Sequence, residues 1–169
     1  RTTDAINNMT FYRYKLLNRN NLSLNRTYFS LWSDPDLGCY TDDYIGVDTI
    51  TGLGYVYNSD ANDDPVCGTD AVGYGTSVPA LGVDYFRGPL DSAGNQIGLS
   101  SFVYFVNSND PVRGNPGAAI QHYRLMDGLW LDGRPISRGG TGDNGTTADK
   151  FPYVFYSFPN ETGPDAWSM

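Results

Sequence analysis

The sequence has very little of two residue types, Glu and His. Only one of its 19 acidic residues is Glu (Glu161), and His122 is the single His. Glu favours helices, whereas Asp favours loops and turns. The chain also contains 20 Gly, 10 Pro and 13 Tyr. This composition predicts an all-β protein with many acidic loops.

Long apolar runs and cation clusters are also missing. No apolar stretch reaches the roughly 20 residues that a membrane-spanning helix needs. The 11 Lys and Arg residues form no polybasic cluster, and the net charge is −8. Binding to nucleic acid or to an anionic membrane requires a basic face. We therefore expect neither a nucleic-acid partner nor membrane insertion.

No catalytic constellation is evident. The sequence lacks a Gly-x-Ser-x-Gly elbow, a His-Glu-x-x-His motif and a phosphate loop. His122 falls in an expected helix, where a surface or core role is commoner than general-base catalysis. We expect a protein that is not an enzyme, and a catalytic domain is the third choice among the functions considered.

The length of 169 residues fits one domain. Residues 1–8 read as a lead-in or linker, and 9–169 as a single domain. Because the chain starts at Arg1 without an initiator Met, we expect a fragment of a longer polypeptide. Aromatic and β-branched runs predict strands at 9–17, 27–32, 44–47, 53–57, 80–86, 99–106 and 153–158. With one short helix near 118–127, capped by Gly128, they predict a β-sandwich or jelly roll with long acidic loops.

The densest acidic stretch is 34–48, where five carboxylates fall within 15 residues. Such charges repel one another unless a cation lies between them, and Ca²⁺ prefers oxygen ligands of this kind. A solvated acidic turn is the alternative. The predicted ligands in this stretch are Asp34, Asp36, Asp42, Asp43 and Asp48.

A second acidic run follows at 60–64. Asp60, Asn62 and Asp64 alternate along the chain, so their side chains can point the same way. They could bind the same Ca²⁺, bind a second ion, or form a solvated loop. The ligand spacing is not that of an EF-hand.

Two further features lie on or near these loops. Cys39 and Cys67 either form a disulfide that ties the acidic loops together or remain two buried thiols. Exposed aromatic rings stack on sugars, although core packing explains most aromatics equally well. The candidate aromatic ligand-binding residues are Trp32, Tyr40, Tyr74 and Trp130.

Several phrases resemble a region of large secreted or cell-surface proteins of Bacteroidota that are exported by the type IX secretion system. These phrases are WSDPDLG at 32–38, YTDDYIGVDT at 40–49, LGYVYN at 53–58, GVDYFRGPL at 82–90, GLWLDGRP at 128–135, GGTG at 139–142 and FPNETGPDAWS at 158–168. The resemblance covers the chain from about residue 9 onward. Val47 departs from it, because many relatives are expected to have Cys there.

The resemblance implies an extracellular or cell-surface location and says little about activity. It also makes Thr49 and Ser92 candidate O-glycosylation sites, since each follows Asp and precedes an apolar residue. The expected function is a Ca²⁺-stabilised structural or adhesive domain of a bacterial surface protein, such as a fibre or surface-layer subunit. Its partners would be further copies of itself, other surface proteins or glycans. The alternative is a carbohydrate-binding module of a secreted hydrolase.

Overall fold

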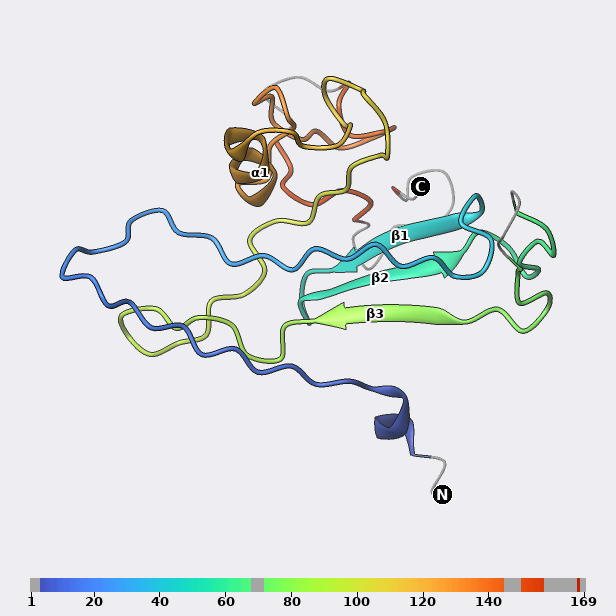
Figure 1. Cartoon of the computed structure of the whole chain (residues 1–169), viewed down its shortest axis with the longest axis horizontal. Coiled ribbons are helices and arrows are strands. Elements are labelled where there is room, and N and C mark those ends of the chain that lie inside the picture. The colour runs from blue at the N-terminus through green and yellow to red at the C-terminus, as the bar shows by residue number, and fades with distance from the viewer. Residues whose placement is uncertain (1–3, 68–71, 145–149, 157–166, 168–169) are drawn as a thin grey trace.

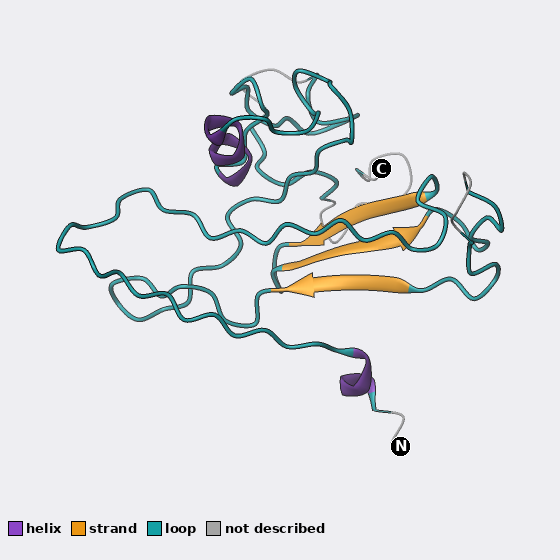
Figure 2. Ribbon diagram, viewed as in Figure 1, coloured by secondary structure: helices purple, strands orange, loops and turns teal. Residues whose placement is uncertain are grey.

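The computed structural model describes residues 4–67, 72–144, 150–156 and 167. In these residues the chain is mostly non-helical, with one small sheet and one short α-helix (Figures 1 and 2). The elements in chain order are the 3₁₀ helix η1 (Ala5–Asn8), the strands β1 (Asp43–Asp48), β2 (Leu53–Asn58) and β3 (Ala80–Asp84), and the helix α1 (Ala119–Met126). The mostly-β prediction is thus confirmed at this coarse level.

The three strands form an antiparallel sheet in the order β1-β2-β3. β1 and β2 make a hairpin in which Asp43 lies opposite Asn58 and Asp48 lies opposite Leu53. The Asp48 carboxylate closes the turn, because it accepts hydrogen bonds from the backbone N–H groups of Ile50 at 2.8 Å and Thr51 at 3.3 Å. The hairpin therefore fixes Asp43 beside Asn58 at one end and Asp48 in the turn at the other.

A close backbone approach explains one glycine of the hairpin. Gly46 lies opposite Tyr55, and the Tyr55 ring covers it so closely that a Cβ at position 46 would lie 2.5 Å from the ring. A side chain at Gly46 would therefore displace the ring. The neighbouring Val47 and Val56 are buried and hold the other face of the hairpin.

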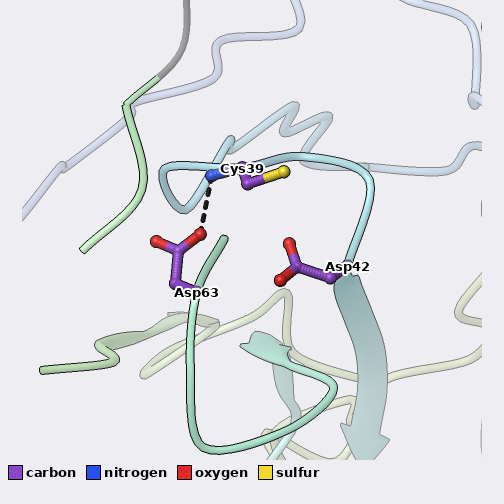
Figure 3. Close-up of side chains that lie close together, drawn as sticks. All are labelled: Cys39, Asp42 and Asp63. Carbon is purple, nitrogen blue, oxygen red and sulfur yellow. Dashed lines mark hydrogen bonds between the residues drawn. The ribbon is translucent and has the colours of Figure 1, made fainter. Parts of the chain in front are cut away.

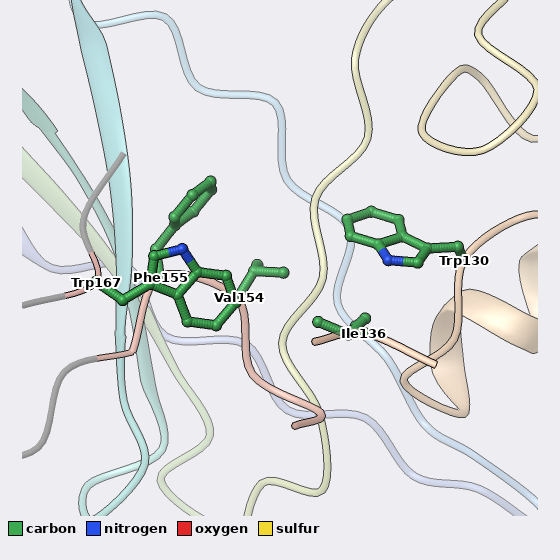
Figure 4. Close-up of a cluster of buried hydrophobic side chains, with 5 residues drawn as sticks. All are labelled: Trp130, Ile136, Val154, Phe155 and Trp167. Atoms are coloured by element: carbon green, nitrogen blue, oxygen red, sulfur yellow. The ribbon is translucent and has the colours of Figure 1, made fainter. Parts of the chain in front are cut away.

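The main hydrophobic core lies in the C-terminal half of the chain (Figure 4). Trp130 is fully buried, and its indole N–H donates to the Gly142 carbonyl at 2.9 Å. Ile45 of β1 packs against this core, so the core joins the sheet to the later segments. The buried members of the core are Trp130, Ile136, Val154, Phe155 and Trp167.

The helix α1 confirms the predicted helix near 118–127. The Gln121 side chain accepts hydrogen bonds from the backbone N–H groups of Gly117 at 2.8 Å and Ala118 at 3.1 Å, which satisfies donors at the N-terminus. Gly128 ends the helix with a φ of +70°, a conformation that glycine adopts without strain. Within the described residues, no helix is long and apolar enough to cross a membrane.

The strand predictions succeeded only where a partner strand is present. Those at 44–47, 53–57 and 80–86 correspond to β1, β2 and β3. Those at 9–17, 27–32 and 99–106 were wrong: these segments belong to no sheet, apart from an isolated bridge between Phe102 and Tyr153. A strand needs a hydrogen-bonded neighbour, which local sequence cannot supply. The last prediction, at 153–158, lies partly outside the described residues.

Candidate metal centre

A disulfide joins the two acidic loops. Cys39 lies before β1 and Cys67 lies after β2; their sulfur atoms are bonded and their Cα atoms are 5.0 Å apart. The predicted disulfide is therefore present in the structure. Because it closes a segment with a sequence separation of 28 residues, it holds the start of the hairpin close to the loop that follows the hairpin.

A fully buried carboxylate occupies the space between these loops. Asp63 is 0% exposed. Its Oδ1 atom accepts a hydrogen bond from the Cys39 backbone N–H at 2.9 Å (Figure 3). Its Oδ2 atom accepts one from the Tyr74 backbone N–H at 2.6 Å. Gly38, with a φ of +81°, leaves room for this carboxylate, since a Cβ there would collide with Oδ2. The backbone around position 38 is thus shaped around Asp63.

A second carboxylate lies close to the first (Figure 3). One carboxylate oxygen of Asp42, one of Asp63 and the Cys39 sulfur all lie within 4.8 Å of one another. The sulfur belongs to the disulfide, so it is not a thiolate and is a poor ligand for a hard cation. None of the ion pairs formed by described residues involves Asp42 or Asp63. Two close carboxylates without a cationic partner repel each other strongly at low dielectric.

Three buried side-chain oxygens at the end of the hairpin that joins these loops have no hydrogen-bond partner within the part of the chain that the structure describes. They are Asp42 Oδ1, Asp43 Oδ1 and Asn58 Oδ1. Asn58 is only 6% exposed, and it lies directly opposite Asp43 in the hairpin, so the two side chains lie on one face of the sheet. Buried polar atoms are nearly always paired with protein, water or an ion, so these oxygens are candidate cation ligands.

The pKa of Asp43 reflects its burial and the negative charges nearby. Burial raises the pKa of the Asp43 carboxyl above its usual range, and the nearby charges of Asp42, Asp63 and Asp36 raise it further, against a lowering hydrogen bond from the Leu37 N–H at 2.9 Å. Without a cation, ionised Asp43 is therefore disfavoured in the folded protein. A divalent ion among these groups would reverse that effect.

The donor set fits Ca²⁺ better than a softer metal. Carboxylate and amide oxygens are the usual protein ligands of Ca²⁺, which takes six to eight of them in flexible geometry. Asp42, Asp43, Asn58 and Asp63 supply only such oxygens, and backbone carbonyls and water would complete the shell. No described His, Glu or free thiol joins the group. The arrangement is therefore a candidate site for a hard cation.

The structure brings together only part of the predicted ligand set. Asp42 lies in the cluster with Asp63, and Asp43 is the next residue, whose pKa responds to both of them and to exposed Asp36. Asp48 lies at the opposite end of β1, where its carboxylate closes the hairpin turn. The remaining predicted ligands, Asp34, Asp60, Asn62 and Asp64, are exposed, and the Asp60 carboxylate accepts a hydrogen bond from the Asn62 N–H at 2.7 Å.

Sequence reasoning missed Asn58 and Asp63. In the 60–64 run, alternation selected the residues on either side of Asp63, whereas the structure buries Asp63 and exposes its neighbours. The loop is not a strand, so a period of two does not apply to it. Asn58 could have been found, because the short turn after Asp48 pairs the hairpin so that Asn58 faces Asp43.

The other predicted sites differ in accessibility. Trp32, Tyr40 and Tyr74 are exposed, whereas the prediction of Trp130 as a ligand-binding aromatic was wrong, since its ring is buried in the core. Thr49 lies partly exposed in the β1–β2 turn, and Ser92 is exposed in a turn between Asp91 and Asn95.

Comparison with protein-family models finds no match, and comparisons with curated proteins and with solved structures find none either.

Proposed function

We propose that this chain is a Ca²⁺-stabilised structural or adhesive domain of the cell exterior. One observation carries the proposal: Asp42, Asp43 and Asn58 each have a buried oxygen without a described partner, and the Asp42 carboxylate lies close to that of buried Asp63 in loops that a disulfide joins. A disulfide is typical of oxidising compartments, and Ca²⁺ is abundant outside cells.

The ion would act passively. Bound between β1 and the 58–67 loop, it would neutralise carboxylates that otherwise repel one another. A ligand that binds only the folded state stabilises that state in proportion to the logarithm of its concentration. The acidic loops would then stay folded and resist proteolysis wherever Ca²⁺ is present.

The resemblance to type IX-exported surface proteins of Bacteroidota supports a role as a fibre or surface-layer subunit. O-glycosylation at Thr49 and Ser92 belongs to the same proposal, and the exposure of both positions is compatible with it. We also propose that the full β-sandwich or jelly roll forms only when segments such as 9–17 and 27–32 find a pairing strand in a neighbour.

Limited proteolysis of the oxidised protein tests this function. With Ca²⁺ present we expect the segment from β1 to Cys67 to resist cleavage, and with excess chelator we expect cleavage there within the same time. The matched variant is Asp60→Asn, which alters an exposed carboxylate and should keep the Ca²⁺ effect. Equal cleavage rates with and without Ca²⁺ would contradict the proposal.

Carbohydrate binding is the second candidate, because exposed aromatics lie beside the acidic loops. Tyr40 follows Cys39 in the chain, and the Tyr74 backbone N–H donates to Asp63. Both residues therefore lie next to the proposed metal centre, and both rings are exposed. Glycan binding that is lost in Tyr40→Ala and Tyr74→Ala but kept in Tyr12→Ala, another exposed tyrosine, would support this function. If the protein binds no glycan, the carbohydrate-binding function is contradicted.

A further inference from the structure

The segment 9–32, here named the arm, leaves its side chains in solvent. Every arm residue is exposed except Tyr28, which is partly buried. In Figure 1 the arm runs away from the sheet, turns at one end of the molecule and returns toward β1. Its exposed large apolar residues are Met9, Phe11, Tyr12, Tyr14, Leu16, Leu17, Leu22, Leu24, Phe29, Leu31 and Trp32. Apolar exposure on this scale marks an interaction surface.

The arm and the sheet carry opposite charge. Between Asp4 and Asp34 the chain has four cations and no acidic residue. From 34 to 86 it has ten Asp and no Lys or Arg. A basic, apolar arm is thus followed directly by a region whose charged residues are all acidic. This charge complementarity favours another copy of the same chain as the partner.

Within one chain the arm leaves most of this charge unused. Arg26 pairs with Asp127 at 3.4 Å. Arg13, Lys15 and Arg19 form no ion pair among the described residues. The arm contacts later parts of the chain through aromatic pairs, Phe11 with Phe86 at 5.6 Å and Tyr28 with Tyr123 at 5.3 Å between ring centroids. Its cations do not neutralise the acidic loops of its own chain.

The acidic region in turn offers exposed charge and free strand edges. Asp34, Asp36, Asp60 and Asp64 are exposed. In the sheet order β1-β2-β3, β1 and β3 each have one edge that no described strand covers. An extended peptide that adds to such an edge gains backbone hydrogen bonds as well as charge contacts. The arm could span up to about 80 Å if fully extended, which is enough to cross a second molecule.

We propose that the arm of one copy docks on the acidic region 34–64 of a second copy. The apolar arm residues supply the buried area, and Arg13, Lys15 and Arg19 supply the charge that selects the acidic region. This inference rests on the proposed role as a structural subunit and names its partner. It does not use the proposed metal ligands Asp42, Asp43, Asn58 and Asp63, because the exposed carboxylates at its centre, Asp60 and Asp64, are different residues.

A charge-swap experiment tests the docking. The arm variant carries Arg13→Glu and Lys15→Glu, and the region variant carries Asp60→Lys and Asp64→Lys. Sedimentation velocity should show that the unmodified chain associates in a concentration-dependent way and that each variant alone is monomeric. An equimolar mixture of the two variants should associate again, because each arm then meets a region of opposite charge. The matched control, Arg87→Glu with Lys150→Glu, changes the charge as much as the arm variant does and should associate like the unmodified chain.

Three results would overturn the inference. They are a monomeric unmodified chain at every concentration, an arm variant that associates as well as the unmodified chain, and a mixture of variants that stays monomeric. Calcium-dependent protection from proteolysis, measured on the same samples, keeps the two claims separate. If that protection persists while association fails, only the docking is wrong. If protection is lost while association persists, the metal centre is wrong and the docking stands.

Discussion

Asp63 and Cys39 are linked by a buried hydrogen bond across 24 residues. The Asp63 carboxylate accepts the Cys39 backbone N–H at 2.9 Å, while the Cys39 side chain is bonded to Cys67. Cys39 is thus connected twice to the loop that follows β2: its backbone N–H donates to Asp63, and its sulfur is bonded to Cys67. This double connection positions Asp42, three residues later, beside Asp63.

Replacing Asp63 should show how much this buried acceptor contributes. Asp63→Ala leaves the N–H groups of Cys39 and Tyr74 without partners, and each unpaired buried donor costs about 1–3 kcal/mol. We expect urea unfolding to show a loss of about 2–5 kcal/mol, and a smaller loss for Asp63→Asn, which keeps one acceptor. An Asp63→Ala protein as stable as the unmodified chain would show that the carboxylate is not buried in this way.

Removing the disulfide should destabilise the same region. For a loop of this length, the entropy model gives a stabilisation of about 3–4 kcal/mol. The double variant Cys39→Ser and Cys67→Ser should therefore unfold at lower urea concentration than the oxidised protein and match the reduced protein. If oxidised and reduced forms unfold at the same midpoint, the pairing seen here does not constrain the folded chain.

The core can be tested through its buried indole. Trp130→Phe removes the N–H that donates to Gly142 and leaves a cavity, so we expect a loss of about 2–4 kcal/mol in the free energy of unfolding. Trp32→Phe is the matched control, since Trp32 is 67% exposed, and should change stability by less than about 0.5 kcal/mol. Equal effects of the two substitutions would contradict the core described here.

The raised pKa of Asp43 predicts a pH dependence with a definite sign. Because the folded pKa lies above the unfolded value of about 3.9, the folded state binds more protons between these two values. In chelator, the contribution of Asp43 to stability therefore falls as the pH rises through this window.

Other carboxyls, such as Asp48 and Asp110, have lowered pKa values and act in the opposite direction. The difference between the unmodified chain and Asp43→Asn isolates the effect of Asp43. In chelator near neutral pH, urea unfolding should show Asp43→Asn to be the more stable form. In Ca²⁺ the order should reverse, because a ligand has been lost. The same order in both conditions would contradict a role for Asp43 in cation binding.

The sequence predicted what depends on local pattern. The two strands of the hairpin were predicted from their aromatic and β-branched runs, and α1 was predicted together with its capping residue Gly128. The local pattern of the arm predicted strands at 9–17 and 27–32, but no described strand pairs with either segment. Asp63 was missed because its burial depends on Gly38 and Tyr74, which contact it only in the folded chain. The acidic loops were singled out as a candidate metal centre, which stays a prediction, whereas placing Asn58 opposite Asp43 needed the strand register.

Thermal unfolding of the oxidised protein, first in excess chelator and then with added Ca²⁺, tests the metal centre most directly. The proposed site predicts a Tm that rises with Ca²⁺ concentration and falls back with chelator, and a response that is much reduced in Asp42→Asn but retained in Asp34→Asn. A Tm that is the same with chelator and with Ca²⁺ would contradict it, and the acidic loops would then be solvated turns.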